Sequence, residues 1–232
     1  KDENMPPLKF YTAMRFILPE KAKEFVEKYN HNGLKICILP AGSNADRIYP
    51  TASWWVKMMK AVANSFPDVR FYMTGAKSKE GGRSESYTFS DTDIDLILGE
   101  VDNIENCFDI GIINQIALLE HCDLLISPHS GFAFLAGCVN TPWLALSGAR
   151  WPEYFYNHIQ FYSVLPSCNK YPCYTGMREE CISEMKSGNP VICMGNSELD
   201  KKLPGIIDGI RKLTDQSYTY SDSIELYRKN VL

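Results

Sequence analysis

The sequence lacks an excess of charge of one sign, and it lacks a long uninterrupted apolar run. Its 232 residues carry 24 lysines and arginines against 28 aspartates and glutamates, a formal net charge of −4. No basic segment predicts a nucleic-acid partner. The most apolar stretch, Phe132–Leu146, is interrupted by Asn140 and Pro142, and it falls short of the roughly 20 residues that a membrane-spanning helix needs. No basic segment followed by an apolar one opens the chain, so neither a signal peptide nor a membrane span is predicted.

Three motifs of nucleotide-binding proteins and hydrolases are also missing. The chain has no GxGxxG, which disfavours a dinucleotide-binding turn, and no GxxxxGK[ST], which excludes a P-loop. No GxSxG elbow is present, so Ser130 is not expected to be a hydrolase nucleophile. The hydrophobic share of 45% and the charged share of 22% are typical of a globular domain and not of a disordered or fibrous chain.

Apolar runs alternate with amphipathic segments along most of the chain. Strands are expected at Leu34–Leu39, Val69–Thr74, Ile94–Leu98, Asp123–Ser127, Trp143–Leu146 and Phe161–Val164. Helices are expected at 20–30, Thr51–Phe66, Ile112–Glu120, Phe132–Val139, Leu199–Leu213 and Ser221–Arg228, whereas 76–93 and most of 148–195 are expected to be irregular. Such alternation predicts an α/β fold, with a doubly wound, mostly parallel sheet and helices on both of its faces.

Loops that follow predicted strands carry side chains suited to anions, and ligands of parallel sheets bind beyond the carboxyl ends of the strands. The first loop holds Gly42, Ser43, Asn44 and Arg47, the second His129, Ser130 and Gly131, and the third Gly148 and Arg150. Glycine permits close approach of a ligand, and arginine can clamp an anionic oxygen. Ser130 is a natural N-cap for the expected helix behind it, whose free amides would attract phosphate. Together the loops predict a site for a diphosphate, although ordinary turns with surface side chains remain the alternative.

Two segments resemble the heptosyltransferase family of glycosyltransferases, which transfer a sugar from ADP-heptose. In Ile38–Gly75, a Pro-Ala-Gly-Ser turn precedes Arg47-Ile48-Tyr49-Pro50, where the family has a His/Pro-Gly-Ser turn and a basic-x-Trp-Pro motif. The second segment ends CDLLISPHSGFAFLAGCVNTPWLALSGAR at Arg150, and it is similar to the family's ADLVVGNDSGPMHLAAALGTPVVALFGPT. The resemblance covers roughly residues 34–195.

This resemblance implies the Rossmann-like, C-terminal donor-binding half of a GT-B glycosyltransferase. Residues 1–33 would be a linker and lead-in helix, and 34–232 the nucleotide-sugar domain. An N-terminal acceptor domain with the catalytic base would lie outside this chain. The resemblance assigns Arg47 to a donor phosphate, Ser130 and Gly131 to the diphosphate, and Ile110 to the nucleotide base. Lys77 and Glu80 fall in the loop where a ribose-contacting acid is usual.

The chain departs from the family pattern at three positions. His129 replaces the aspartate before Ser-Gly, Phe134 replaces a histidine, and Tyr49 replaces the tryptophan before proline. The expected partners are a nucleotide-diphosphate sugar, a glycan or lipid-linked acceptor, and the protein's own acceptor domain, without a cofactor. Such an enzyme would serve cell-surface polysaccharide or lipopolysaccharide synthesis in the cytoplasm or peripherally at the inner membrane surface. A fucosyltransferase-like or other GT-B transferase, and a non-catalytic nucleotide-sugar binding module, stay as alternatives.

The cysteines form two groups by their surroundings. Core positions are expected for Cys37, Cys107, Cys122 and Cys138, whereas Cys168, Cys173, Cys181 and Cys193 cluster in a polar stretch. Four thiolates could bind Zn²⁺ tetrahedrally, but no CxxC pair is present. Thiols packed near the donor site are therefore the favoured interpretation.

Asp91-Thr92-Asp93 has the spacing of a metal motif but is interpreted as a solvated turn, so metal-independent transfer is expected.

Overall fold

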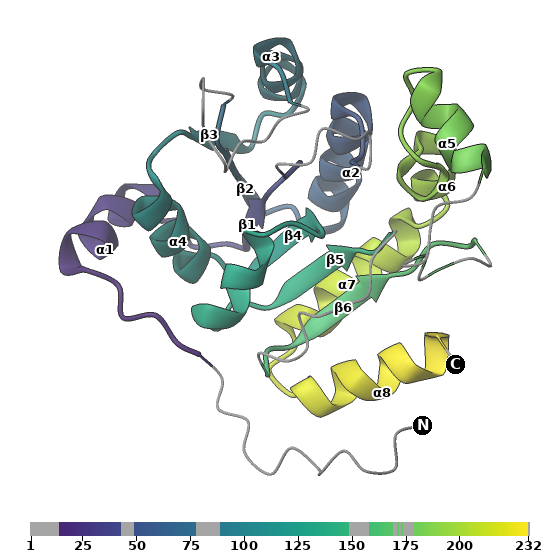
Figure 1. The fold of residues 1–232 in the computed structure, drawn as a ribbon. Coiled ribbons are helices and arrows are strands. Elements are labelled where there is room, and N and C mark those ends of the chain that lie inside the picture. The colour runs from purple at the N-terminus through teal and green to yellow at the C-terminus, as the bar shows by residue number, and fades with distance from the viewer. Residues whose placement is uncertain are drawn as a thin grey trace.

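The computed structural model describes residues 14–42, 49–77, 89–148, 158–168, 171, 173 and 179–231. Within these residues, six parallel strands form one sheet in the order β3-β2-β1-β4-β5-β6 (Figure 1). The strands are β1 (Lys35–Ile38), β2 (Arg70–Gly75), β3 (Ile104–Phe108), β4 (Leu124–Pro128), β5 (Trp143–Leu146) and β6 (Phe161–Val164). The predicted doubly wound α/β fold is thereby confirmed.

Helices cover both faces of the sheet. One face packs against α2 (Ala52–Ser65), α3 (Asp91–Glu100) and α7 (Leu203–Thr214). The other packs against α1 (Glu20–Val26), α4 (Ile112–His121) and α8 (Tyr220–Val231). Shorter elements are η1 (Glu27–Tyr29), η2 (Ala133–Cys138), α5 (Glu179–Lys186), η4 (Ile192–Met194) and α6 (Asn196–Asp200). Because α1 packs on α4, the lead-in helix shares the core of the domain.

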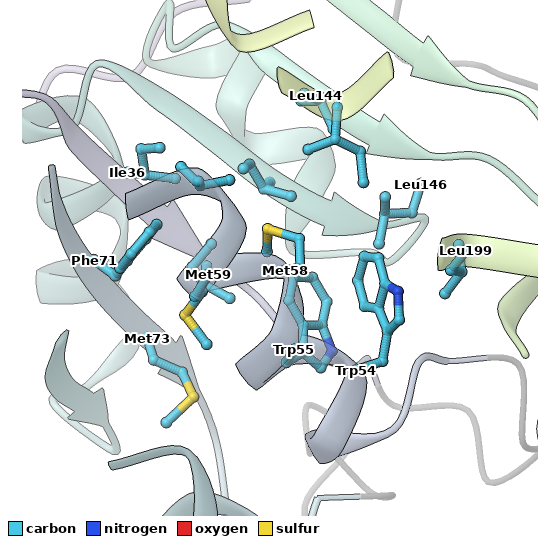
Figure 2. Close-up of a cluster of buried hydrophobic side chains, with 14 of the residues drawn as sticks. Ile36, Trp54, Trp55, Met58, Met59, Phe71, Met73, Leu144, Leu146 and Leu199 are labelled. Atoms are coloured by element: carbon cyan, nitrogen blue, oxygen red, sulfur yellow. The ribbon is translucent and has the colours of Figure 1, made fainter. Parts of the chain in front are cut away.

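Alternation of side chains along the strands divides the core into two layers. On the α2 face, Trp54, Trp55 and the two methionines of α2 pack over Ile36 and Leu144 (Figure 2). The opposite layer contains Trp143 and the predicted core thiols Cys37, Cys107 and Cys122. Full burial of a large apolar side chain contributes roughly 1.5–3 kcal/mol, so both layers stabilise the sheet that carries the rim loops.

The third predicted strand is wrong. Ile94–Leu98 lies inside α3, and the strand is β3, which the sequence analysis did not identify. Ser90 Oγ accepts a hydrogen bond from the Asp93 amide at 3.2 Å, and Asp93 Oδ2 accepts one from the Ser90 amide at 2.9 Å. This capping box starts a helix, and the macrodipole favours acidic residues in its first turn. The Asp91–Asp93 segment, interpreted as a solvated turn, is largely exposed but forms the first turn of α3.

Two more predictions in the C-terminal third need correction. The single helix expected at Leu199–Leu213 is divided into α6 and α7. Pro204 lies in the first turn of α7, where its missing N–H costs nothing and where a new helix readily begins. The stretch expected to be irregular also contains α5, whose charged, short sequence gave only a weak apolar period.

The C-terminal helix protects one edge of the sheet. Phe161 of the edge strand β6 donates its N–H to Ser223 Oγ of α8 at 3.0 Å, and that hydroxyl donates to the Thr219 carbonyl at 3.1 Å. On the opposite edge strand, Asn106 Oδ1 accepts the Phe108 N–H at 3.0 Å. Both bonds occupy edge donors that are otherwise open to pairing.

In the described part of the chain, we find no helix with the length and apolarity needed to cross a bilayer.

The packing of α7 on β6 can be tested at a glycine. A Cβ atom on Gly209 would lie 2.5 Å from Tyr162 Cδ1, whereas nothing lies within 4 Å of one on Gly99 in α3. We expect Gly209→Ala to lower the free energy of unfolding by about 1–2 kcal/mol through overpacking. The matched control Gly99→Ala should raise it by about 0.5–1 kcal/mol. Urea denaturation measures both, and equal shifts would contradict this packing.

Candidate functional site

The strand order places a reversal point between β1 and β4. The chain runs from β1 to β2 on one side and from β4 to β5 on the other, and ligands of open parallel sheets bind in the crevice at such a point. The loop after β1 continues through Ala41 and Gly42, and the turn after β4 contains His129, Ser130 and Gly131. Two of the three predicted loops therefore follow neighbouring strands and lie at the same end of the sheet, where the carboxyl ends of the strands meet.

Gly42 brings these two loops into contact. A Cβ atom on Gly42 would lie 2.7 Å from Ser130 Cβ and 2.7 Å from Tyr49 Oη. Only a residue without a side chain fits there, because real Cβ atoms do not approach other heavy atoms so closely. Gly42 is buried, and so is Tyr49, the residue that departs from the family's tryptophan. The structure thus places the predicted Gly42 and Ser130 together.

The turn at Ser130 keeps part of its predicted character. Ser130 Oγ accepts a hydrogen bond from the Ala133 amide at 3.2 Å, as an N-cap would. The helix expected at Phe132–Val139 is present as the 3-10 helix η2, Ala133–Cys138, and not as an α-helix. Gly137 lies within that segment, and Asn140 at φ 62° follows it, which prevents an α-helix from growing. A short 3-10 helix has a smaller dipole than the helix that the prediction assumed, so the predicted anion site would depend on the local amides.

Gly131 stands at the open side of this turn. It is exposed, and nothing lies within 4 Å of a Cβ atom built on it. A ligand can therefore approach its backbone without meeting a side chain of the described residues. Contact of Gly131 with a diphosphate stays a prediction.

His129 lies against an aromatic side chain of the next strand. Its ring is 5.9 Å from the Trp143 ring, centroid to centroid, in an edge-to-face arrangement with an interplanar angle of 73°. Both ring nitrogens are shielded from solvent. Phe134 contacts the same indole at 5.6 Å and 85°. The two residues that replace the family's aspartate and histidine therefore share one partner, which the sequence analysis missed.

The loops after β2 and β3 are joined by polar contacts. Lys77 donates its backbone N–H to Asp109 Oδ1 at 3.0 Å, and its ammonium forms a 2.7 Å ion pair with Asp91 of α3. The hydrogen bond to Asp91 and the charge of that carboxylate raise the pKa of the Lys77 ammonium above its usual value. Asp109 has φ 58° and Gly111 φ 87°. Positive φ is uncommon for a residue with a side chain such as Asp109, whereas glycine adopts it without strain.

Ile110 lies between Asp109 and Gly111, which both have positive φ. It is half-buried against the α4 side of the core, and its carbonyl accepts a hydrogen bond from Asn114 Nδ2 at 2.8 Å. The neighbouring Ile112 and Ile113 are exposed by 51% and 44%. This rim therefore offers an apolar surface beyond β3, in line with a base-contacting role for Ile110, which stays a prediction.

The late cysteine stretch reaches the loop after β5. A Cβ atom on Gly148 would lie 2.8 Å from Cys193 Sγ and 2.8 Å from Met194 Cε. Cys181 and Cys193 are buried, whereas Cys168 and Cys173 are partly exposed. The residues that the structure describes bring together no group of three or more metal-ligating side chains. Geometry therefore gives no support to a zinc site built from these four cysteines.

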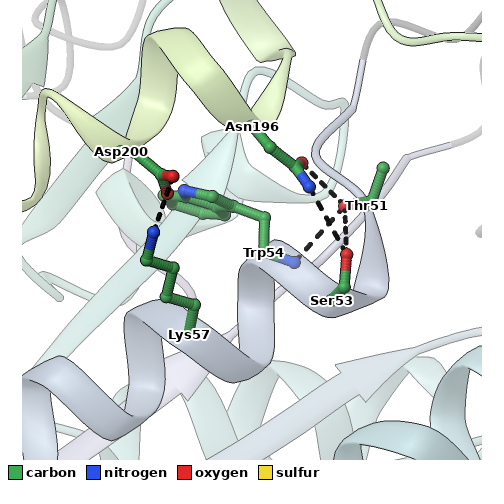
Figure 3. Close-up of polar contacts among 6 residues, drawn as sticks. All are labelled: Thr51, Ser53, Trp54, Lys57, Asn196 and Asp200. Carbon is green, nitrogen blue, oxygen red and sulfur yellow. Dashed lines mark hydrogen bonds and ion pairs between the residues drawn. The ribbon is translucent and has the colours of Figure 1, made fainter.

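A polar clamp fixes the start of α2 (Figure 3). Thr51 Oγ1 accepts the Trp54 amide at 3.3 Å and donates to Asn196 Oδ1 at 2.8 Å. One turn along, Lys57 and Asp200 form a 2.6 Å ion pair. The clamp ties α6 to the helix that follows the Arg47 loop. Five of the predicted site residues lie outside the residues that the structure describes: Ser43, Asn44, Arg47, Glu80 and Arg150.

We compared the sequence and the fold with those of known proteins. No protein-family model and no curated protein matches the sequence. Among solved structures, ADP-heptose lps heptosyltransferase II of E. coli superposes with a TM-score of 0.55 at 12% identity, over 85% of this chain and 54% of that one. The glycosyl transferase family 9 structure from Veillonella parvula DSM 2008 gives 0.53 at 13% identity, over 84% and 54%. The chain has a heptosyltransferase-like fold.

A third match extends this comparison. The E. coli heptosyltransferase WaaC with ADP superposes with a TM-score of 0.51 at 12% identity, over 84% of this chain and 46% of that one. The chain thus spans about half the length of these heptosyltransferase structures. At such identities the likeness establishes the heptosyltransferase-like fold that the sequence resemblance implied, and the fold alone.

The contact between the two loops can be tested through stability. We expect Gly42→Ala to lower the free energy of unfolding by about 1–3 kcal/mol, because the new methyl group meets Ser130 Cβ and Tyr49 Oη. Gly131→Ala, on the open side of the same turn, should change it by less than about 0.5 kcal/mol. Urea denaturation followed by circular dichroism decides. A neutral Gly42→Ala would mean that the loops do not touch in solution.

Proposed function

We propose that this chain is the donor-binding half of a glycosyltransferase that moves a sugar from a nucleotide-diphosphate sugar to an acceptor hydroxyl. The observation that carries the proposal is the approach of the loops after β1 and β4, where Gly42 meets Ser130 at the reversal point of the sheet. The heptosyltransferase-like fold supports it. Cell-surface polysaccharide or lipopolysaccharide synthesis, in the cytoplasm or at the inner membrane surface, is the process we assign to it.

In this proposal, the chemical role of the donor-binding half is to bind the nucleotide diphosphate, which is the leaving group of the transfer. As the glycosidic bond breaks, negative charge grows on the diphosphate, and fixed donors aimed at that charge lower the barrier. In our proposal the amides of the Ser130–Gly131 turn and the guanidinium of Arg47 provide those donors. The nucleotide base lies against Ile110, and Lys77 and Glu80 flank the ribose. The acceptor and the catalytic base belong to an N-terminal domain of the complete enzyme.

Calorimetry with ADP-, GDP- and UDP-sugars tests the donor site. We expect one nucleotide class to bind, and Arg47→Ala to weaken it at least about tenfold, because a hydrogen bond to a charged group is worth about 1.5–3 kcal/mol. The matched control is Arg228→Ala, an exposed arginine of α8, which should bind as the wild type does. If the wild-type chain binds none of the three classes, the proposal is wrong.

Gly131 gives an independent test of where the diphosphate lies. Gly131→Ala keeps the fold, because nothing occupies the space around its Cβ position. The added methyl group would stand where the phosphate oxygens approach the backbone, so we expect affinity for the bound nucleotide to fall about tenfold, equivalent to 1.4 kcal/mol. Gly99→Ala, whose methyl group also enters open space, serves as the control. Unchanged affinity in Gly131→Ala would move the diphosphate away from this turn.

A further inference from the structure

The buried side chain of Trp143 packs against the residues on both sides of the Ser130–Gly131 turn. Trp143 is the first residue of β5 and is fully buried. Its indole Nε1–H donates to Ser127 Oγ at 2.9 Å. The same ring contacts His129 at 5.9 Å and Phe134 at 5.6 Å. One indole therefore touches the chain before and after the two residues assigned to the diphosphate.

The strand register explains why these contacts meet on one ring. Trp143 of β5 lies beside Leu125 of β4 in the parallel pairing. Side chains alternate along a strand, so Ser127 projects to the same face as Leu125. An indole at that position reaches Ser127 and the turn after β4, and η2 returns Phe134 over the same ring. The arrangement follows from the sheet itself and not from a chance surface contact.

The indole is well suited to hold a turn in one conformation. It is a rigid plane with only two side-chain torsions, and its N–H bond to Ser127 fixes the direction of the ring. Ser127 is also fully buried, and breaking a bond between two buried groups leaves polar atoms unsatisfied. Edge-to-face contacts then fix the rings of His129 and Phe134 on the indole.

We propose that Trp143 is a positioning residue, which holds the turn after β4 so that Ser130 and Gly131 meet the loop of Gly42 in the geometry that binds a diphosphate. This inference rests on the proposed function, because the ligand is the one assigned there. It adds a residue that the sequence analysis placed only in a strand. Trp143 itself, fully buried, acts through the turn and not by touching the ligand.

The test separates positioning from simple core packing. The variants are Trp143→Leu, which removes the ring, and Trp143→Phe and Ser127→Ala, which each remove one side of the hydrogen bond. Trp55→Phe is the matched control, since Trp55 is equally buried but packs on the opposite face of the sheet. Two quantities are measured for each: calorimetric affinity for ADP, GDP and UDP, and amide hydrogen exchange of residues 129–133 without ligand.

We expect Trp143→Leu to weaken nucleotide affinity about tenfold or more and to speed exchange in the turn, since small displacements of binding groups are costly. Trp143→Phe and Ser127→Ala should each weaken affinity about threefold. The double variant with both substitutions should bind the nucleotide about as weakly as either single variant, because both substitutions remove the same hydrogen bond. Trp55→Phe should lower the melting temperature and leave affinity and exchange of the turn unchanged.

Each other outcome has a definite meaning. If the wild type binds a nucleotide and all three turn variants bind it equally well, the positioning role is overturned while the proposed function stands. If the wild type binds no nucleotide, the proposed function fails, and exchange at residues 129–133 still decides whether Trp143 fixes the turn. If Trp143→Leu does not fold, Trp143→Phe and Ser127→Ala carry the decision.

Discussion

The candidate site depends on the absence of a side chain at Gly42. A Cβ atom there would lie 2.7 Å from Ser130 Cβ, so any other residue would force the loops after β1 and β4 apart. Because β1 and β4 are neighbours at the reversal point, this contact fixes how closely the loops after the two strands approach each other.

The supports of the two loops come from distant parts of the chain. The helix that follows the β1 loop is held through Thr51 and Asn196, and the turn after β4 rests on Trp143. Gly148 in the loop after β5 packs on Cys193, which links the late cysteine stretch to the same edge. The exposed Thr51–Asn196 bond contributes modestly to stability, whereas the bond between the buried Trp143 and Ser127 is costly to break.

The sequence predicted the elements whose apolar period was strong. Helix α2 and strands β5 and β6 lie where expected. The sequence also placed the loops of Gly42 and Ser130 at one end of the sheet, but their direct contact depends on the strand order. Strand β3 was missed, because the aspartates of α3 were weighed against a strand instead of as helix-starting residues, although Ser90-x-x-Asp93 was the available signal. The bond between Thr51 and Asn196 spans 145 positions, and the grouping of His129 and Phe134 on Trp143 depends on strand register. Local patterns do not contain such information.

The hydroxyl of Ser223, bound to the Phe161 amide, also bears on how the molecule behaves among its own copies. A terminal strand with free amides can recruit a strand from a neighbouring molecule, and protein sheets grow into aggregates by that route. Here α8 packs against β6, and its Ser223 hydroxyl accepts a hydrogen bond from one amide of that edge strand. Removal of this helix would leave the Phe161 amide at the edge of β6 free to pair with a strand of another molecule.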